Sequence, residues 1–211
     1  MSDTITILNV DSHPLWSLGV ASVINDQPDM RLVAQASTGR EAIDYFRAHQ
    51  TDIILTDIRL PDISGIEFMI AIRAEFPSRR FIIVTGFAHD NEIRRALAHG
   101  ARAYLLKSMP PAEFLEAIRQ VHAGKKCIPP EIAARLAEHL AEEPLSDREV
   151  EVLRLVMAGN RNQDVAHHLY ISVETVKTHM KRIMEKLSAS DRTHAITIAA
   201  QRGILQLWGT Q

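Results

Sequence analysis

The feature that most constrains the fold is a fivefold alternation of short apolar runs with longer amphipathic stretches in the first 124 residues. The apolar runs are rich in Ile, Val and Leu and are too short for ordinary helices. They predict strands at residues 4–10, 30–36, 52–57, 81–86 and 103–107. The stretches between them predict helices at 14–25, 39–49, 65–76, 91–99 and 111–123. This order predicts an α/β fold in which a five-stranded parallel sheet is doubly wound, as in flavodoxin-like folds.

The pattern changes near residue 125, where "AGKKCIPPE" carries two lysines and two adjacent prolines, which is typical of a boundary. A short linker helix is expected within 130–142. Beyond Leu145 the sequence predicts four closely connected helices, with a capping box formed by Ser146 and Glu149 at the first. Their expected ranges are about 147–158, 162–170, 173–187 and 193–203. We therefore predict three parts, namely residues 1–124, a linker at 125–144, and an all-α domain at 145–211.

Composition limits the class of protein. A chain of 211 residues with 46% hydrophobic residues can bury two cores. The net charge of −2 hides an asymmetry, because from Pro144 onward nine Lys and Arg stand against seven Asp and Glu. The single Cys127 excludes an intramolecular disulfide framework. With no leader-like start and no run long enough to span a bilayer, we expect a cytoplasmic protein with no membrane partner.

Four polar residues fall at the carboxyl ends of predicted strands, where doubly wound sheets build their sites. Asp11 ends the first strand, Asp57 the third, Thr85 the fourth and Lys107 the fifth. A carboxylate can accept a phosphoryl group, and two carboxylates can share a Mg²⁺ ion that neutralises its charge. A hydroxyl and an ammonium can then bind the phosphoryl oxygens. The set predicts a phosphoryl-transfer site.

Longer segments support that prediction by resemblance. The segments "IILTDIRLPDISGIE", "IIVTG" and "GARAYLLKS" resemble the phosphoacceptor, threonine and lysine segments of response-regulator receiver domains. The segment "VDSHPL" resembles the acidic segment of the NarL/FixJ subfamily, and the match covers residues 1 to about 124. The resemblance implies a phosphoacceptor, a switch hydroxyl, a rotating aromatic, a phosphate-pairing cation and two loop-shaping residues. These are Asp57, Thr85, Tyr104, Lys107, and the pair Pro61 and Gly65.

One position departs from the family pattern. Asp11 is followed by Ser12, where the family usually has a second acid that contacts the metal most directly. The substitution removes one charge and one strong oxygen ligand, so Mg²⁺ binding by Asp11 and Asp57 is expected to be weakened. Two hypotheses follow: Ser12 is tolerated in a working site, or phosphorylation is slow or replaced by another input. His13 invites a metal-ligand interpretation, but the following Pro14 favours a helix-start position.

The segment at 162–187 predicts a helix-turn-helix, because a short helix, a tight turn and a longer helix with one apolar stripe follow each other. It lies within a stretch that resembles the LuxR-type DNA-binding domain of the same subfamily. The resemblance directs Lys177, Thr178 and Lys181 toward the major groove of double-stranded DNA. Residues Thr175, Arg182 and Lys186 are better placed for the phosphate backbone.

These features predict a two-component response regulator that binds DNA and regulates transcription, switched by phosphorylation of Asp57. A sensor histidine kinase and a homodimer on DNA are the expected partners, and the protein is not expected to be an enzyme. One alternative is a phosphorylation-independent regulator with a pseudo-receiver, controlled by constitutive dimerisation, a ligand or a partner protein. A more remote one is a phosphatase with Asp57 as nucleophile. Arg59 counts against it, because that chemistry needs an aspartate there as general acid.

Overall fold

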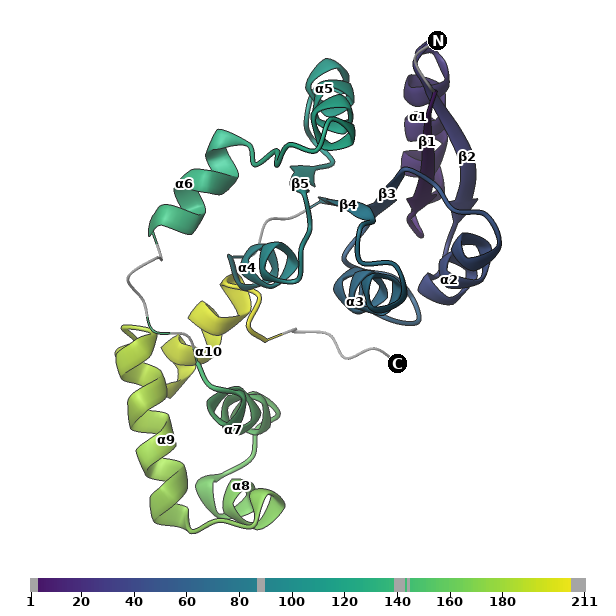
Figure 1. The fold of residues 1–211 in the computed structure, drawn as a ribbon. Coiled ribbons are helices and arrows are strands. Elements are labelled where there is room, and N and C mark those ends of the chain that lie inside the picture. Colours follow the sequence, from purple (N-terminus) through teal and green to yellow (C-terminus); the bar gives the residue numbers. More distant parts are fainter. Residues whose placement is uncertain (1–3, 87–89, 139–142, 144, 206–211) are drawn as a thin grey trace. The chain divides into compact units, whose positions relative to one another are not determined.

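The computed structural model describes residues 4–86, 90–138, 143 and 145–205, and these form two compact units (Figure 1). One unit contains the sheet and its helices as far as Arg135, and the other begins at Leu136. This boundary falls inside the linker expected at 125–144, and the finer domain limits remain predictions. Among the described helices, none combines the length and apolarity needed to cross a membrane.

The first unit is built on a five-stranded sheet with the order β2-β1-β3-β4-β5, in which every neighbouring pair is parallel. This confirms the predicted α/β class and the doubly wound sheet. Strands β1, β3, β4 and β5 are almost wholly buried on both faces, as expected for near-continuous runs of Ile, Val and Leu, whereas the edge strand β2 is buried only at its two ends. Their bounds are β1 Ile5–Val10, β2 Met30–Ala36, β3 Ile53–Thr56, β4 Arg80–Thr85 and β5 Ala103–Leu106.

Five helices cover the two faces of this sheet. Their bounds are α1 Pro14–Asn25, α2 Gly39–Ala48, α3 Gly65–Glu75, α4 Asp90–Ala98 and α5 Pro111–His122. Figure 1 shows α1 and α5 on one side of the strands and α2, α3 and α4 on the other. Under α1 and α5, residues such as Ile24 and Ile118 form one core with alternate strand residues such as Leu55. On the opposite face Phe68 packs edge-to-face on Phe81, with ring centroids 5.6 Å apart.

Local capping decides where several helices begin. Ser64 and Glu67 form a capping box that starts α3 immediately after the loop that follows Asp57. The helix α2 begins at Gly39, as predicted, and the side chain of the preceding Thr38 is the N-cap, which accepts from the Glu41 backbone N–H.

The second unit is all helical, as predicted. The helix α6, Pro130–Glu138, spans the boundary between the units, and part of its predicted range lies outside the described residues. It is followed by α7 Asp147–Met157, α8 Asn162–Leu169, α9 Val173–Lys186 and α10 Arg192–Gln201. The predicted capping box of Ser146 and Glu149 at α7 is confirmed. Apolar residues of all four helices, including Val152, Val165, Ile183 and Ala199, form one core.

Candidate functional site

The parallel sheet brings three charged residues together at the carboxyl ends of its strands, and we call this region the acidic edge. Asp11 directly follows β1, Asp57 directly follows β3, and Lys107 directly follows β5. Backbone hydrogen bonds continue the strand pairing to this edge: Asp57 N–H donates to Val10 O at 2.9 Å, and Lys107 N–H donates to Thr85 O at 2.8 Å. The strand order therefore gathers residues that are up to 96 positions apart in the sequence.

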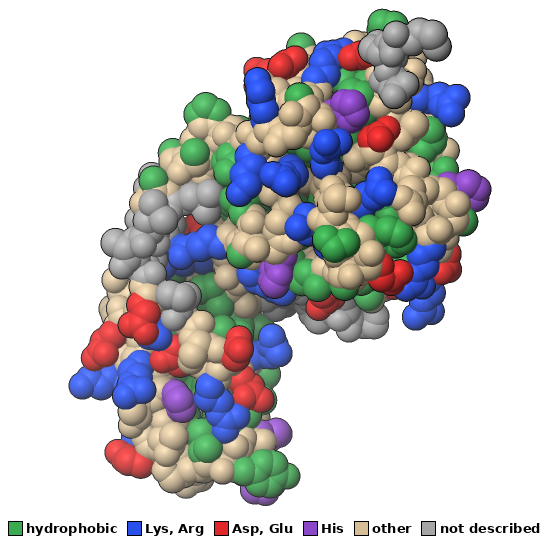
Figure 2. All heavy atoms as spheres, viewed as in Figure 1, with side chains coloured by type: hydrophobic (Ala, Val, Ile, Leu, Met, Phe, Trp, Pro, Cys, Tyr) green, Lys and Arg blue, Asp and Glu red, His purple; other side chains and the backbone are tan. Residues whose placement is uncertain are grey.

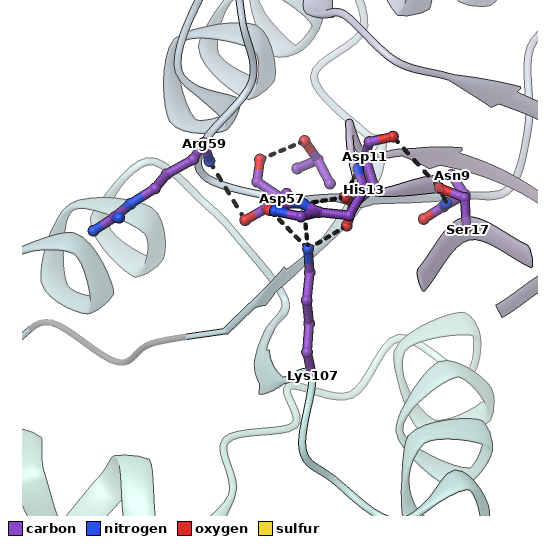
Figure 3. A network of polar contacts seen from close by, with 8 residues as sticks. Asn9, Asp11, His13, Ser17, Asp57, Arg59 and Lys107 are labelled. Atoms are coloured by element: carbon purple, nitrogen blue, oxygen red, sulfur yellow. Dashed lines mark hydrogen bonds and ion pairs between the residues drawn. The ribbon is translucent and has the colours of Figure 1, made fainter. Parts of the chain in front are cut away.

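Lys107 bridges the two carboxylates (Figure 3). Its Nζ lies 2.6 Å from Asp11 Oδ2 and 2.8 Å from Asp57 Oδ2. The side chains of Asp11 and Asp57 are only 1% and 4% exposed, so two like charges share a space with little water. The ammonium is needed there, because two uncompensated buried carboxylates would repel each other.

His13 is the site residue that sequence reasoning underestimated. It is the N-cap residue of α1, as its neighbour Pro14 predicted, with φ −92° and ψ 105°. Its side chain does not cap the helix, and its Nδ1 lies 2.9 Å from Asp11 Oδ1 and 3.6 Å from Asp57 Oδ2. The signal was the spacing of two after an aspartate, because the Asp11 side chain accepts from the His13 backbone N–H and so holds His13 beside it.

The two expected switch residues lie on neighbouring strands. Thr85 ends β4 and is 4% exposed, and Tyr104 lies within β5 and is fully buried. In the β4–β5 pairing Thr85 is opposite Leu106, and Tyr104 is opposite Ile83. Both residues are thus held on strands rather than on a loop, Thr85 at the carboxyl end of β4 and Tyr104 on the edge strand β5.

The loop after Asp57 is closely packed against the start of α3. Gly65 N–H donates to Ile58 O at 2.8 Å, and a Cβ added at Gly65 would lie 1.9 Å from Asp57 O. Arg59 N–H donates to Asp57 Oδ1 at 3.4 Å, while its side chain points away from Lys107 in Figure 3. Pro61 is exposed on the same loop.

The donor set fits a divalent cation. Single ligand atoms of Asp11, His13 and Asp57 all lie within 4.8 Å of one another. Asp11 Oδ2 is fully buried and accepts no hydrogen bond of good geometry from the described residues, although it is ion-paired with Lys107. Buried carboxylate oxygens with free coordination capacity are what a hard cation requires. Ser12 is half-buried beside them and adds no charge.

In the second unit, most residues expected to face DNA lie on the exposed side of α9. They are Thr175, Lys177, Thr178, Lys181 and Arg182. The lysines are not isolated charges, because Lys177 Nζ lies 3.1 Å from Glu174 and Lys181 Nζ lies 3.9 Å from Glu185. Figure 2 likewise shows Lys, Arg, Asp and Glu side chains interspersed over the surface of this unit. Its exposed face is therefore mixed in sign rather than uniformly basic.

The expectation for Lys186 needs correction. Its side chain is only 15% exposed, and its Nζ lies 2.9 Å from Glu149 Oε2 and 3.0 Å from Glu143 Oε1. The hydrogen bond to Glu149 raises the pKa of Lys186 above its ordinary value. Burial acts to raise the pKa of Glu149, but hydrogen bonds from Ser146 and Lys186 outweigh it and hold that pKa below the ordinary value. Lys186 is thus paired with the glutamate of the α7 capping box and does not belong to the exposed face of α9.

Comparison with known families agrees with this division. The model of the response regulator receiver domain matches residues 7–119, and the model of bacterial regulatory proteins of the luxR family matches residues 143–199. The first match alone spans more than half of the chain.

Two relatives match almost the whole chain. The response regulator protein VraR of Staphylococcus aureus strain NCTC 8325 is 32% identical over 208 residues, which cover 96% of this chain and all of that protein. The crystal structure of the response regulator ChrA, from a heme-sensing two-component system, is 32% identical and covers 96% of this chain and 99% of that one, with a TM-score of 0.57.

A more distant structure has the same fold. It is RcsB from Salmonella enterica serovar Typhimurium, bound to promoter P1flhDC in the presence of the phosphomimetic BeF3-. It is 22% identical, covers 94% of this chain and 99% of that one, and has a TM-score of 0.75. The chain therefore belongs to the response-regulator family. Both family models match it, and each matched region has the expected structure, a sheet with an acidic edge in the first unit and a helical fold in the second. The chain is a two-component response regulator with a receiver domain and a luxR-type DNA-binding domain, a class of transcription regulators and not of enzymes.

Proposed function

We propose that this response regulator is switched by phosphorylation of Asp57. The observation that carries the proposal is the position of Asp57, whose carboxylate lies in the acidic edge with Lys107 Nζ 2.8 Å away. In the transfer, a carboxylate oxygen of Asp57 bonds to phosphorus, and the bond between phosphorus and the donor's leaving group breaks. A sensor histidine kinase or a small phosphodonor supplies the phosphoryl group.

The surrounding residues have separate tasks in this proposal. A Mg²⁺ ion held by Asp11 and Asp57 would neutralise charge on the transferring group. Lys107, now shared between two carboxylates, pairs with a phosphoryl oxygen once Asp57 is esterified. Thr85 donates to another phosphoryl oxygen, and Tyr104 adjusts its packing in response. The surface around β4 and β5 then changes and favours a homodimer.

A second candidate rests on Ser12. With one acid missing and the Lys107 ammonium paired with both carboxylates, less negative charge remains at the site for a metal ion to neutralise. A receiver in that state could act through constitutive dimerisation, a ligand or a partner protein, with no phosphorylation. This candidate predicts that Asp57 stays unmodified at any phosphodonor concentration.

Phosphodonor treatment separates the two candidates. We expect the full-length protein, incubated with acetyl phosphate and excess Mg²⁺, to gain the mass of one phosphoryl group and to shift toward dimer. Asp57→Asn removes the attacking oxygen and is expected to abolish both changes. Intact mass and sedimentation velocity are the measurements.

The outcomes are exclusive. A mass gain that persists in Asp57→Asn contradicts Asp57 as the acceptor. No gain in the wild type at saturating donor contradicts the switch and supports the phosphorylation-independent regulator.

We further propose that α8 and α9 form the helix-turn-helix that binds double-stranded DNA, with α9 in the major groove. The support is the exposed face of α9, on which Lys177, Thr178 and Lys181 can reach base edges while Thr175 and Arg182 reach phosphates. A homodimer would bind two DNA half-sites one helical turn apart, because its two-fold symmetry places one copy of α9 in the major groove at each half-site. The acidic neighbours Glu174 and Glu185 must release the lysines as DNA approaches.

Lys181→Ala tests this surface. We expect operator binding to weaken by about 1–3 kcal/mol with relaxed specificity if Lys181 reads a base. If it meets only phosphate, the loss is uniform across sequences and the salt slope falls by about one unit. Binding titrations at several salt concentrations measure both quantities.

Lys186→Met is the matched control, because it removes a lysine of the same helix that is bound to Glu149. We expect the folded variant to keep the wild-type salt slope. An unchanged affinity for Lys181→Ala, or a slope change for Lys186→Met, contradicts this assignment.

A further inference from the structure

His13 adds a nitrogen donor to a site whose expected ligands are all oxygens. Its Nδ1 points toward the two carboxylates (Figure 3). It lies 2.9 Å from Asp11 Oδ1 and 3.6 Å from Asp57 Oδ2. Ligands of one ion at about 2.0–2.2 Å from it stand at most about 4.4 Å apart, and the three donor atoms here already lie within 4.8 Å of one another. Only small movements are needed to bring all three onto one ion.

The position of the imidazole is set by the backbone. Pro14 restricts His13 to extended conformations, and the observed φ of −92° and ψ of 105° agree with that restriction. His13 N–H also donates to Asp11 Oδ1 at 2.8 Å, which ties the residue to the carboxylate it faces. The imidazole makes no capping hydrogen bond to α1, so the start of the helix does not use its ring nitrogens. The donor is therefore pre-positioned rather than recruited by metal binding.

The donor set changes which ion the site prefers. Mg²⁺ binds oxygen ligands, whereas imidazole nitrogen suits divalent transition metals. Ser12 leaves Mg²⁺ with two protein carboxylates, but a transition metal keeps three protein ligands. We infer that His13 is a direct ligand and makes this site selective for divalent transition-metal ions over Mg²⁺, with the smallest preference for Mn²⁺, which binds nitrogen least strongly of that series. This deepens the proposed function, since it concerns the cation that would assist phosphorylation of Asp57.

Lys107 does not decide this selectivity. Its Nζ lies 2.6 Å from Asp11, 2.8 Å from Asp57 and 3.2 Å from His13 Nδ1, so any divalent cation must displace it. The cost of that displacement is the same for Mn²⁺ and Mg²⁺ and cancels in the ratio of their affinities. The ratio therefore isolates the contribution of the His13 nitrogen.

The test uses the full-length protein, freed of metal by a chelator that is then removed. Electron paramagnetic resonance of free Mn²⁺ gives its dissociation constant, and displacement of Mn²⁺ gives that of Mg²⁺. We expect His13→Ala to lower the preference for Mn²⁺ over Mg²⁺ by about threefold or more, because Mn²⁺ binds imidazole nitrogen more readily than Mg²⁺ does, although less strongly than later transition metals. We also expect ¹⁴N modulation in the electron spin echo of bound Mn²⁺, and its loss in His13→Ala.

Two further variants complete the design. His49→Ala removes an exposed histidine that precedes β3, at the opposite edge of the sheet, and is expected to leave the ratio unchanged. Ser12→Asp restores an oxygen ligand and is expected to raise Mg²⁺ affinity. An unchanged Mn²⁺ to Mg²⁺ ratio in His13→Ala, or no nitrogen modulation in the wild type, overturns the inference.

Failure of this inference is distinguishable from failure of the proposed function. Phosphorylation of wild type in saturating Mg²⁺ together with an unchanged ratio rejects only the role of His13. Nitrogen-ligated Mn²⁺ without any phosphoryl gain supports the role of His13 and rejects the phosphorylation switch.

Discussion

Gly65→Ala is expected to destabilise the receiver unit by at least about 3 kcal/mol, a cost at the upper end of those for overpacking. The added Cβ would lie 1.9 Å from Asp57 O and 2.9 Å from Asp57 C. Both are backbone atoms, so no side-chain rotation relieves the overlap. Either α3 or the loop that carries Asp57 must shift, and we expect phosphorylation of Asp57 to fall as well. Urea unfolding is the measurement.

Gly19→Ala is the matched control. Gly19 lies inside α1, and a Cβ there would meet no heavy atom within 4 Å. This variant is expected to stabilise the receiver by about 0.5–1 kcal/mol, because alanine has the higher helix propensity. Unfolding of the receiver unit is measured by the fluorescence of Trp16, which packs on Phe114. All variants carry Trp208→Phe, so that Trp16 is the single fluorescent tryptophan. If the Gly65→Ala protein were as stable as the wild type, the close packing of the loop between Asp57 and Gly65 would be contradicted.

Glu149→Ala is expected to destabilise the DNA-binding unit by about 2–4 kcal/mol, from a lost helix cap and a broken, largely buried ion pair. Glu149 is 3% exposed, accepts from Ser146 N–H at 2.8 Å and pairs with Lys186 at 2.9 Å. The change removes the buried partner of Lys186, whereas Glu143, which also pairs with it, has a side chain that is 77% exposed. Glu151→Ala is the control on the same helix, because its exposed pair with Arg148 is worth at most about 1 kcal/mol. Equal losses in both variants would contradict a special role for Glu149.

The same pair predicts a pH dependence. The pKa of Glu149 is lowered in the folded state, so its contribution to stability is fully present above the ordinary value of 4.5 and is lost as pH falls through the folded pKa. The stability difference between wild type and Glu149→Ala should therefore shrink below about pH 4.5. The raised pKa of Lys186 acts oppositely: its contribution is fully present below 10.5 and is lost as pH rises through the folded value. A difference that stays constant across the acid range would contradict the pairing.

The fold was predictable because each local signal agreed with the next. Strand runs buried on both faces alternate with amphipathic helices, and a parallel sheet is the architecture that satisfies both patterns. The same reasoning located the acidic edge, because the carboxyl ends of parallel strands must meet. Asp11, Asp57 and Lys107 could thus be grouped before their distances were known.

Two residues show where such reasoning ends. Helical periodicity put Lys186 on the exposed face of α9, since it counts positions around one helix and ignores the neighbours of that helix. Glu149, 37 residues earlier in the chain, reaches it only through the packing of α7 against α9. His13 was correctly predicted to start α1, but its ring also faces the acidic edge.

The sequence by itself determined the α/β fold class, the edge at which charged residues gather and the helix that carries the basic residues, because these depend on periodicity and on position within an element. Only the tertiary structure decided which charges meet. Ion pairs act over a few ångströms, and those distances depend on how separate elements pack. The pairing of Lys107 with both carboxylates, the capture of Lys186 by Glu149 and the nitrogen that His13 adds beside Asp11 all follow from that packing.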